Sequence, residues 1–183
     1  MKYPTVFHLI ATEFAKARIP FLLVGGFAVN HYKVSRNTWD LDILIRESDF
    51  DGVAPILKGA GYQMEVRTEL FARFRGNHPY FFNTDVIFAD PKTFSGMLAE
   101  GQEIEMKDNR FIIPSLNHLI AMKLHAVKNN PRARAFKDLG DVIDLVRENN
   151  VDIRSDSFRN LCLKFASEEW YRMIMEYASD EKT

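Results

Sequence analysis

The sequence predicts an α+β fold, in which a small mixed sheet flanked by helices is followed by a C-terminal helical bundle. Two observations support this prediction. Up to residue 113, short apolar runs lie between glycine, proline or asparagine residues, which is typical of strands joined by turns. From Pro114 onward, the apolar residues recur at helical spacing instead. We therefore expect a first domain of residues 1–113 and a helical region of residues 114–183.

The first half is expected to begin with a helix and to continue mainly with strands. Apolar residues at helical spacing predict a helix from Thr5 to Arg18, and Pro20 sets its end. Short apolar or alternating runs then predict seven strands. These are Phe21–Val24, Leu41–Ile45, Tyr62–Val66, Glu69–Arg75, Tyr80–Phe88, Glu103–Met106 and Arg110–Ile113.

The other helices are predicted from capping residues and helix breakers. Ser48 is a suitable N-cap for a helix through Asp49 to Ala60, which Gly59 and Gly61 end. Pro91 is expected to open a short helix that runs to Glu100. Further helices are expected at Phe27–Tyr32, Leu116–Lys128 and Ala135–Glu148, with one or two more within Phe158–Tyr177.

The composition limits the classes of protein that fit this chain. The 24 Lys and Arg residues nearly balance the 25 Asp and Glu residues, so the overall charge gives no argument for nucleic-acid binding. Cys162 is the single cysteine, which excludes an intramolecular disulfide framework and is typical of a reducing cytosol. No apolar run approaches the ~20 residues that span a bilayer. We therefore expect a cytoplasmic protein with no membrane partner.

The strand expected at Leu41–Ile45 begins with an acidic pair. Asp40 and Asp42 are two residues apart, so both side chains point to one face of the strand. Two carboxylates side by side on a buried strand repel each other and lose hydration. A bound Mg²⁺ removes both penalties, because hard divalent cations prefer oxygen ligands. This pattern favours a metal site over a solvated strand edge.

Two further features belong with this acidic pair. Asp85 precedes an apolar strand-like run, and a strand adjacent to Asp42 would bring it to the same site. Gly25 and Gly26 end a strand and open a helix, a turn at which backbone N–H groups can hold a phosphate. A glycine pair by itself is also an ordinary turn. Together with three acids it indicates phosphoryl-type chemistry on a nucleotide.

These residues resemble the nucleotidyltransferase superfamily of the DNA polymerase beta type. The resemblance rests on Gly25-Gly26, on Arg36-Asn37-Thr38-Trp39-Asp40-Leu41-Asp42 and on Asp85, in this order. The second half narrows it, because Pro114–Leu124 followed by Lys137–Asp141 looks like the AbiEii-type toxins and related minimal nucleotidyltransferases. The resemblance covers residues 20–148 of the chain.

The resemblance implies a transfer of NMP from an NTP to an acceptor hydroxyl, with release of pyrophosphate. It implies that Asp40, Asp42 and Asp85 are the catalytic residues and the ligands of Mg²⁺ or Mn²⁺. It also implies that the nucleotide-binding residues are Gly25, Gly26, Arg36 and Lys123. It further implies that Lys137 and Asp138 support catalysis. The acid that matches the family's supporting acid is either Asp138 or Asp141. The helical region would then complete the active-site cleft.

The basic residues also have ordinary structural interpretations. Lys123 is equally consistent with a lysine that extends along an apolar helix surface, and Arg36 with a flexible loop cation. Lys128, Arg132 and Arg134 form a basic spot that either guides an anionic acceptor such as RNA or is a solvated face.

Three functions compete at this point. The first is a toxin-like nucleotidyltransferase that modifies tRNA or a protein and has a cognate antitoxin as a partner. The second is a small-molecule enzyme like the aminoglycoside and lincosamide nucleotidyltransferases. The third, a nucleotide-binding module without turnover, is disfavoured because all three acids are present. We expect Asp42→Asn and Asp85→Asn to abolish turnover, keep the fold and stabilise the metal-free protein.

Overall fold

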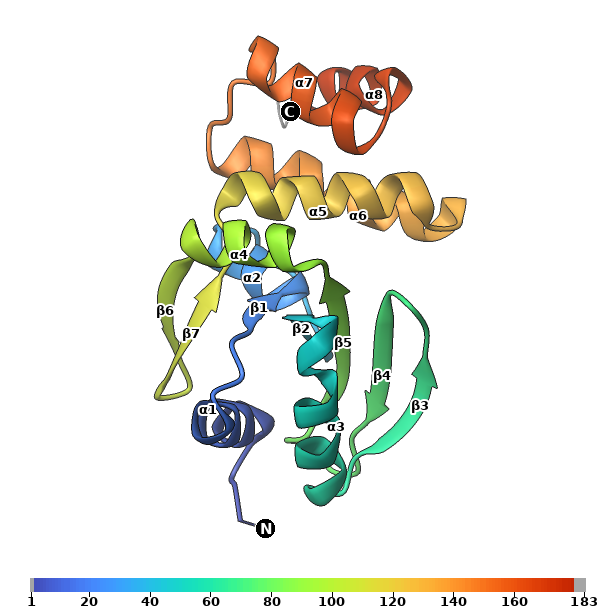
Figure 1. Cartoon of the computed structure of the whole chain (residues 1–183). Coiled ribbons are helices and arrows are strands. Elements are labelled where there is room, and N and C mark those ends of the chain that lie inside the picture. The colour runs from blue at the N-terminus through green and yellow to red at the C-terminus, as the bar shows by residue number, and fades with distance from the viewer. Residues whose placement is uncertain (1, 180–183) are drawn as a thin grey trace. The chain divides into compact units, whose positions relative to one another are not determined.

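The computed structural model describes residues 2–179, and at residues 132 and 133 it describes the backbone alone (Figure 1). The chain forms two compact units. Unit 1 comprises the chain up to Ala28 together with Asn37–Ser115, and unit 2 comprises Val29–Arg36 together with the chain from Leu116. A short segment from early in the sequence thus belongs with the C-terminal helices. The predicted division into domains at residue 113 stays a prediction.

A five-stranded sheet with the order β1-β2-β5-β4-β3 forms the centre of unit 1 (Figure 1). Its strands are β1 (Leu22–Val24), β2 (Asp40–Arg46), β3 (Gln63–Arg67), β4 (Phe71–Arg75) and β5 (Asn83–Ala89). β2 and β5 run parallel, whereas the other neighbouring strands are antiparallel. The predicted small mixed sheet is therefore confirmed.

One face of this sheet is apolar and is covered by helix α3 (Phe50–Gly59). Leu41, Ile43 and Ile45 of β2 are almost completely buried, as the alternation of the strand predicts. Phe50 of α3 packs against the rings of Phe74 and Phe88 from β4 and β5. Because Phe88 is in register with Ile45, α3 covers the face opposite to Asp40 and Asp42. The apolar face thereby anchors β2 and leaves its acidic face to the site.

The start of α3 differs from the prediction. Ser48 lies inside a single 3-10 turn, Glu47–Asp49, and the helix begins after it at Phe50. Asp49 accepts hydrogen bonds from the guanidinium of Arg46, at 2.8 Å from Nε, and caps nothing. Ser48 as the cap was therefore wrong, because the extra turn moves the helix start beyond it. The helix ends at Gly59 with Ala60 as its C-cap, one residue before the predicted end at Ala60.

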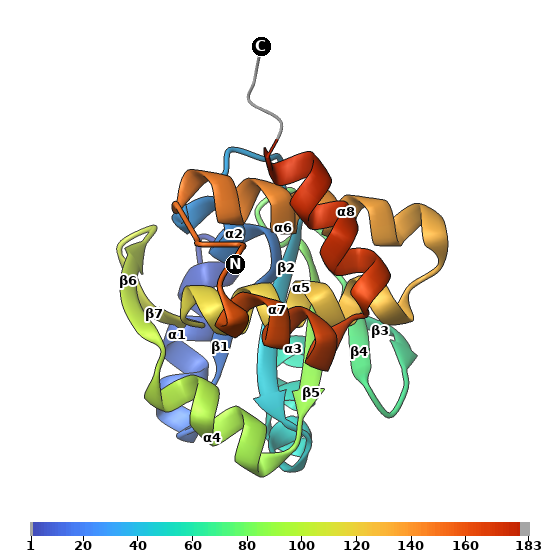
Figure 2. The same ribbon diagram turned by 90° about the horizontal axis from the view of Figure 1, so that it is seen from above.

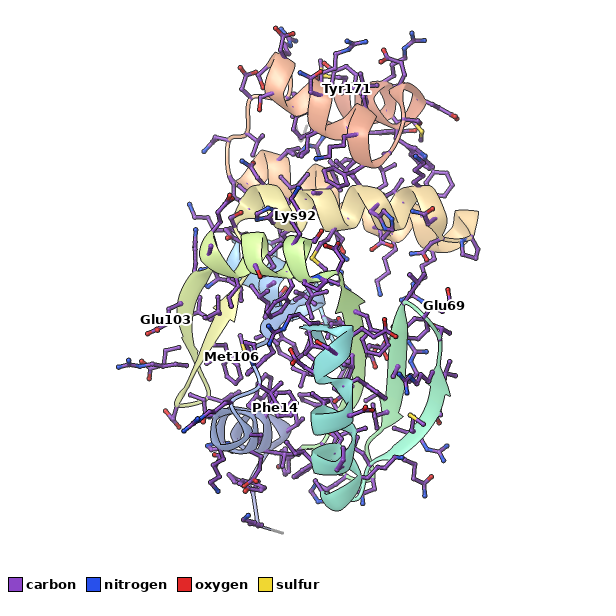
Figure 3. The ribbon with its side chains drawn as sticks, in the orientation of Figure 1. Phe14, Glu69, Lys92, Glu103, Met106 and Tyr171 are labelled. Atoms are coloured by element: carbon purple, nitrogen blue, oxygen red, sulfur yellow. The ribbon has the colours of Figure 1, made fainter. Side chains whose placement is uncertain are left out.

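The rest of the described part of unit 1 consists of two helices, the start of a third and a separate hairpin. Helix α1 (Val6–Ala17) begins at Thr5, whose hydroxyl oxygen accepts a hydrogen bond from the N–H of His8. Its Phe14 is completely buried (Figure 3). The other elements are α2 (Gly25–His31), α4 (Pro91–Ala99), β6 (Gln102–Met106) and β7 (Asn109–Ile113). Strands β6 and β7 pair with each other in a separate two-stranded sheet, and β7 packs against β1 of the larger sheet.

Unit 2 is mainly helical, as predicted (Figure 2). Its helices are α5 (Leu116–Asn129), α6 (Arg132–Glu148), α7 (Asp156–Phe165) and α8 (Glu168–Ser179), together with the end of α2. Helix α6 packs against α5 and α8, and Phe136 meets Trp170 edge to face. Cys162 of α7 is completely buried, and burial raises the pKa of its thiol to about 12. No helix among the described residues has both the length and the apolar character to cross a bilayer.

Candidate functional site

Three carboxylates lie on one face of the central strands of unit 1. Asp42 of β2 is in register with Asp85 of the parallel strand β5, so the two side chains point to the same face. Asp40 lies two residues before Asp42 on the same strand, and therefore on the same face. Asp40 is exposed, Asp42 is half-buried and Asp85 is buried. We call Asp40, Asp42 and Asp85 the acid face.

Gly25 stands directly against the acid face. A side-chain carbon at Gly25 would lie 1.8 Å from Oδ2 of Asp42, which is far inside contact distance. The backbone φ of Gly25 is +61°, a conformation that L-residues rarely adopt. Glycine is thus required at this position by both the close approach of Asp42 and the turn of the backbone.

Gly26 has a similar relation to Thr38. A side-chain carbon at Gly26 would lie 2.5 Å from Oγ1 of Thr38. That hydroxyl donates a hydrogen bond of 3.2 Å to the carbonyl oxygen of Asp40. The glycine pair therefore lets the segment before the acidic pair pack closely on the start of α2. This is a packing reason for both glycines that sequence reasoning had not found; their contact with a phosphate stays a prediction.

Arg73 of β4 is a member of the site that the sequence analysis missed. It is in register with Asp85 across the antiparallel pair of β4 and β5. Its Nε lies 2.8 Å from Oδ1 of Asp85 and its Nη2 lies 2.6 Å from Oδ2, so both carboxylate oxygens accept a hydrogen bond. The bonds to Asp85, with a smaller effect of the nearby Asp40 charge, raise the pKa of Arg73. The one available signal was an arginine amid apolar residues in the run from Phe71 to Phe74.

The acid face has the donor chemistry for Mg²⁺, because carboxylate oxygens are its preferred protein ligands. Within residues 2–179, however, no three metal-ligating side chains are gathered closely enough to hold an ion. Both oxygens of Asp85 are bonded to Arg73 instead. The three acids thus supply the ligand type that Mg²⁺ prefers, and a cation at Asp85 would have to replace its bonds to Arg73.

Unit 2 contains a second group of charged side chains, Arg36, Lys123, Asp138 and Asp141, which we call the charge network. Nζ of Lys123 lies 2.9 Å from Oδ1 of Asp138 and 2.6 Å from Oδ2 of Asp141. Arg36 forms an ion pair with the same oxygen of Asp141. These four side chains are between 8% and 18% exposed. Asp138 and Asp141 therefore both support Lys123, so the structure does not single out one of them.

Helix α2 holds Arg36, which lies in the loop that follows this helix. Its backbone N–H donates to Oδ1 of Asn30 at 3.1 Å, and its carbonyl oxygen accepts a hydrogen bond from Nδ2 of Asn30 at 3.0 Å. Arg36 is thus held at both its backbone and its side chain. Lys123 and Arg36 were predicted to bind nucleotide, and the structure places both in part-buried ion pairs with acids of unit 2.

The remaining basic residues that the sequence singled out and whose side chains are described are exposed, unlike the members of the charge network. Lys137 is exposed although the adjacent Asp138 is buried, because neighbouring positions on a helix do not share a face. Lys128 and Arg134 are exposed as well. The side chain of Arg132 lies outside the described part of the chain.

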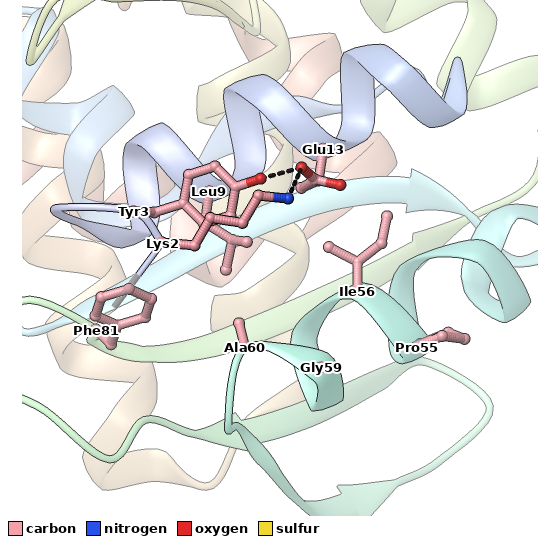
Figure 4. Close-up of a pocket in the computed structure, with 9 residues that line it drawn as sticks. All are labelled: Lys2, Tyr3, Leu9, Glu13, Pro55, Ile56, Gly59, Ala60 and Phe81. Carbon is pink, nitrogen blue, oxygen red and sulfur yellow. Dashed lines mark hydrogen bonds and ion pairs between the residues drawn. The ribbon is translucent and has the colours of Figure 1, made fainter.

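Unit 1 also has a cavity of about 380 Å³ between α1 and the end of α3 (Figure 4). Glu13 of α1 forms ion pairs with Lys2 and Lys16, and Tyr3 donates a hydrogen bond to it. Donation by Tyr3, followed by the two lysines, lowers the pKa of Glu13 to about 2. No residue of the acid face lines this cavity.

Comparison with known proteins identifies the fold. No family model and no curated protein matches the sequence. Among solved structures, the antibiotic-resistance factor ANT(2'')-Ia is similar with a TM-score of 0.64 and 12% identity, over 93% of each chain. The lincosamide antibiotic adenylyltransferase LnuA is similar with a TM-score of 0.53 and 16% identity, over 72% of this chain and 89% of LnuA.

A third similar structure is an antigenic nucleotidyltransferase-like protein from Paracoccidioides brasiliensis. Its TM-score is 0.59 at 12% identity, over 94% of this chain and 90% of that protein. At such low identity, the similarity concerns the fold. The chain therefore has the nucleotidyltransferase fold, as the order of its glycine pair and its three acids predicted.

Proposed function

We propose that the protein is a metal-dependent nucleotidyltransferase that transfers NMP from an NTP to an acceptor hydroxyl. The observation that carries this proposal is the register of Asp42 with Asp85 on parallel strands, with Asp40 on the same face. Three carboxylates that share a face repel each other. Arg73 offsets the charge of Asp85, and a divalent cation would relieve the repulsion that remains. The nucleotidyltransferase fold of the chain supports the same function.

In the proposed reaction, the acceptor oxygen forms a bond to the α-phosphorus while the bond from that phosphorus to the bridging oxygen breaks. Pyrophosphate leaves with the electron pair, and Asp85 is our candidate to receive the proton of the hydroxyl. Asp40 and Asp42 would hold Mg²⁺ or Mn²⁺, which supplies positive charge to the triphosphate. Gly25 and Gly26 are our candidates for the phosphate side of the site, because their backbone carries no obstructing side chain.

We assign Lys123 and Arg36 to the triphosphate, with Asp138 and Asp141 as the groups that hold them. An ammonium carries three N–H donors, and the two ion pairs of Lys123 use two of them. The guanidinium of Arg36 likewise has more donors than its bond to Asp141 requires. Both cations thus keep donors for phosphate oxygens while they stay bound to their acids.

Two classes of acceptor follow from different observations. The motifs Pro114–Leu124 and Lys137–Asp141 resemble the AbiEii-type toxins, which favours tRNA or a protein as the acceptor and an antitoxin as the partner. The similarity to ANT(2'')-Ia extends over 93% of both chains, and one structure of that protein holds adenylyl-2''-tobramycin. This similarity favours a small antibiotic-like acceptor.

The test is a transfer assay with Mg²⁺ and each of the four α-labelled NTPs. The acceptors are total tRNA, a cell protein extract, and a panel of aminoglycosides and lincosamides. Label on tRNA or protein would support the toxin-like class, and label on a drug would support the small-molecule class. NTP binding without transfer to any acceptor would indicate a binding module and contradict the proposal.

A matched pair of variants links any transfer to the acid face. Asp42→Asn keeps the shape of the side chain and removes its charge, and it should abolish transfer. Asp49→Asn is the control, because Asp49 pairs with Arg46 at the other end of β2 and α3 lies directly after it. Equal transfer by wild type and Asp42→Asn would exclude the acid face as the catalytic site.

A further inference from the structure

The ion pair of Arg73 with Asp85 is unusual in its position. Asp85 is one of three acids on one face of two adjacent strands, and its partner comes from the third strand, β4. The pair is bidentate, with bonds of 2.8 and 2.6 Å. The side chain of Asp85 is 11% exposed and that of Arg73 is 37% exposed. A buried carboxylate of the acid face is thus already neutralised by the protein itself.

Such a pair competes with a metal ion for the same oxygens. A bidentate guanidinium uses one lone pair of each carboxylate oxygen and lowers the negative potential around both. A divalent cation that approaches Asp85 therefore meets both a repulsive charge and occupied acceptors. Arginine keeps this charge at every accessible pH, because its guanidinium does not deprotonate in proteins.

We propose that Arg73 is an internal counter-cation of Asp85 that holds this carboxylate when metal is absent and opposes its use as a metal ligand. Asp85 then joins Asp40 and Asp42 around a cation when Arg73 releases at least one of its two bonds. Arg73 is thus a positioning residue that acts through Asp85. This inference rests on the proposed function of the acid face as a metal site.

Arg75 shows that the placement of Arg73 is specific. Both arginines lie on β4, two residues apart, and hence on the same face of the strand. Arg75 bonds to Gln63 at 2.9 Å and to Glu65 at 3.2 Å, on the edge strand β3. Register therefore directs one arginine to the acid face and the other away from it. This difference makes Arg75 the matched control.

The test measures binding of Mn²⁺ alone, without nucleotide, by electron paramagnetic resonance and titration calorimetry. Arg73→Gln removes the charge but keeps a polar side chain, and Arg75→Gln removes a charge from the same strand. We expect Arg73→Gln to bind Mn²⁺ about tenfold more tightly, because a unit charge a few ångströms away affects a cation by at least this factor. Arg75→Gln should bind Mn²⁺ like the wild type.

Arg73→Lys and thermal melting complete the test. Lysine keeps the charge but offers no bidentate fork, so the gain in Mn²⁺ affinity should be smaller than for Arg73→Gln. Metal-free Arg73→Gln should melt below the wild type, because Asp85 loses its partner, and Mn²⁺ should raise its melting temperature more than that of the wild type. If Arg73→Gln does not fold, Arg73→Lys is compared with the wild type instead. Tighter Mn²⁺ binding by Arg73→Lys would then support the inference.

Unchanged or weaker Mn²⁺ binding by both Arg73 variants would overturn the inference, as would an equal gain in Arg75→Gln. The proposed function has a separate readout, the transfer of label from NTP by the wild type. Tighter Mn²⁺ binding by Arg73→Gln would support the counter-cation role even if the wild type transferred no label to any acceptor.

Discussion

The acid face of unit 1 and the charge network of unit 2 both bring carboxylates and cations together, but they differ in access to solvent. Asp40 is exposed, and the side chain of Arg73, which binds Asp85, is 37% exposed. In the charge network, Lys123 is 13% exposed and Asp141 is 8% exposed. The acid face is thus open to solvent at Asp40 and along Arg73, although Asp85 is buried, whereas all four side chains of the charge network are largely covered.

This difference indicates how each group contributes to the molecule. In a buried network, loss of one partner leaves an uncompensated charge, so each member is required for stability. At an accessible site, water screens the charges, and a substitution affects ligands more than folding. We therefore expect substitution of an acid in the charge network to lower stability, and substitution of an acid in the acid face to lower ligand binding or transfer.

The largest effect on stability is expected from Lys123→Met. Methionine has a similar length but no charge, so Asp138 would lose its ion pair with Lys123, and Asp141 would keep its ion pair with Arg36. Breaking a buried ion pair on one side costs about 3–5 kcal/mol. Urea unfolding followed by circular dichroism measures this loss, and Lys137→Met is the control because Lys137 is exposed. Equal stability of the two variants would mean that the network does not stabilise unit 2.

Asp40→Asn is expected to show the opposite result. Transfer of NMP should fall by about 10²–10³-fold, because a charge that serves the transition state is lost. The free energy of unfolding should change by less than ~1 kcal/mol, since Asp40 is exposed. Initial rates and urea unfolding of the same preparation measure both quantities. A large loss of stability with normal rates would break the contrast between the two groups.

Gly25→Ala tests the packing beneath the acid face. The positive φ alone costs about 1–2 kcal/mol for an L-residue, and the new methyl group would also displace the carboxylate of Asp42. We expect lower stability and lost transfer together. Gly96→Ala is the control, because no atom lies within 4 Å of the added carbon in helix α4. Wild-type behaviour of Gly25→Ala would show that Asp42 can move without consequence.

The smallest effect concerns Cys162, which reports on unit 2. Burial raises the pKa of its thiol from the ordinary value of 9.0 to about 12, so near pH 8 the thiol stays protonated and inaccessible in the folded protein. Because the folded pKa is raised, this group favours folding below pH 9.0 and loses that contribution as the pH rises toward 12. Reaction with a thiol reagent should be slow in wild type and in Asp40→Asn.

The same reagent separates the two units. Lys123→Met should react faster at Cys162, because unit 2 opens more often when the charge network is broken. Equally slow reaction in Lys123→Met and wild type would mean that the network and Cys162 do not belong to one cooperative unit.

The pairing of Asp85 with Arg73 changes one expectation from the sequence. Two adjacent acids suggested that Asp85→Asn would stabilise the metal-free protein. An asparagine, however, offers the guanidinium one neutral oxygen in place of two charged ones. We now expect Asp85→Asn to lower metal-free stability. The stabilisation expected for Asp42→Asn stays a prediction.

Much of the fold was determined by local sequence. The alternation of Asp40, Leu41, Asp42 and Ile43 predicted a strand with one acidic and one apolar face, because successive side chains of a strand point in opposite directions. Helical periodicity likewise predicted α5, and the burial of Cys162 followed from its apolar setting. These features depend on the backbone of one element, and a single sequence contains that information.

Tertiary structure alone decided which charges meet. Arg73 reaches Asp85 through the register of β4 on β5, and Arg36 reaches Asp141 across 105 residues of sequence. Register and long-range pairing result from how whole elements pack, and a shift of one residue would turn every side chain of a strand to the other face. The sequence therefore determined which residues could carry chemistry, and packing decided which of them are paired, because pairing depends on distances that no local pattern contains.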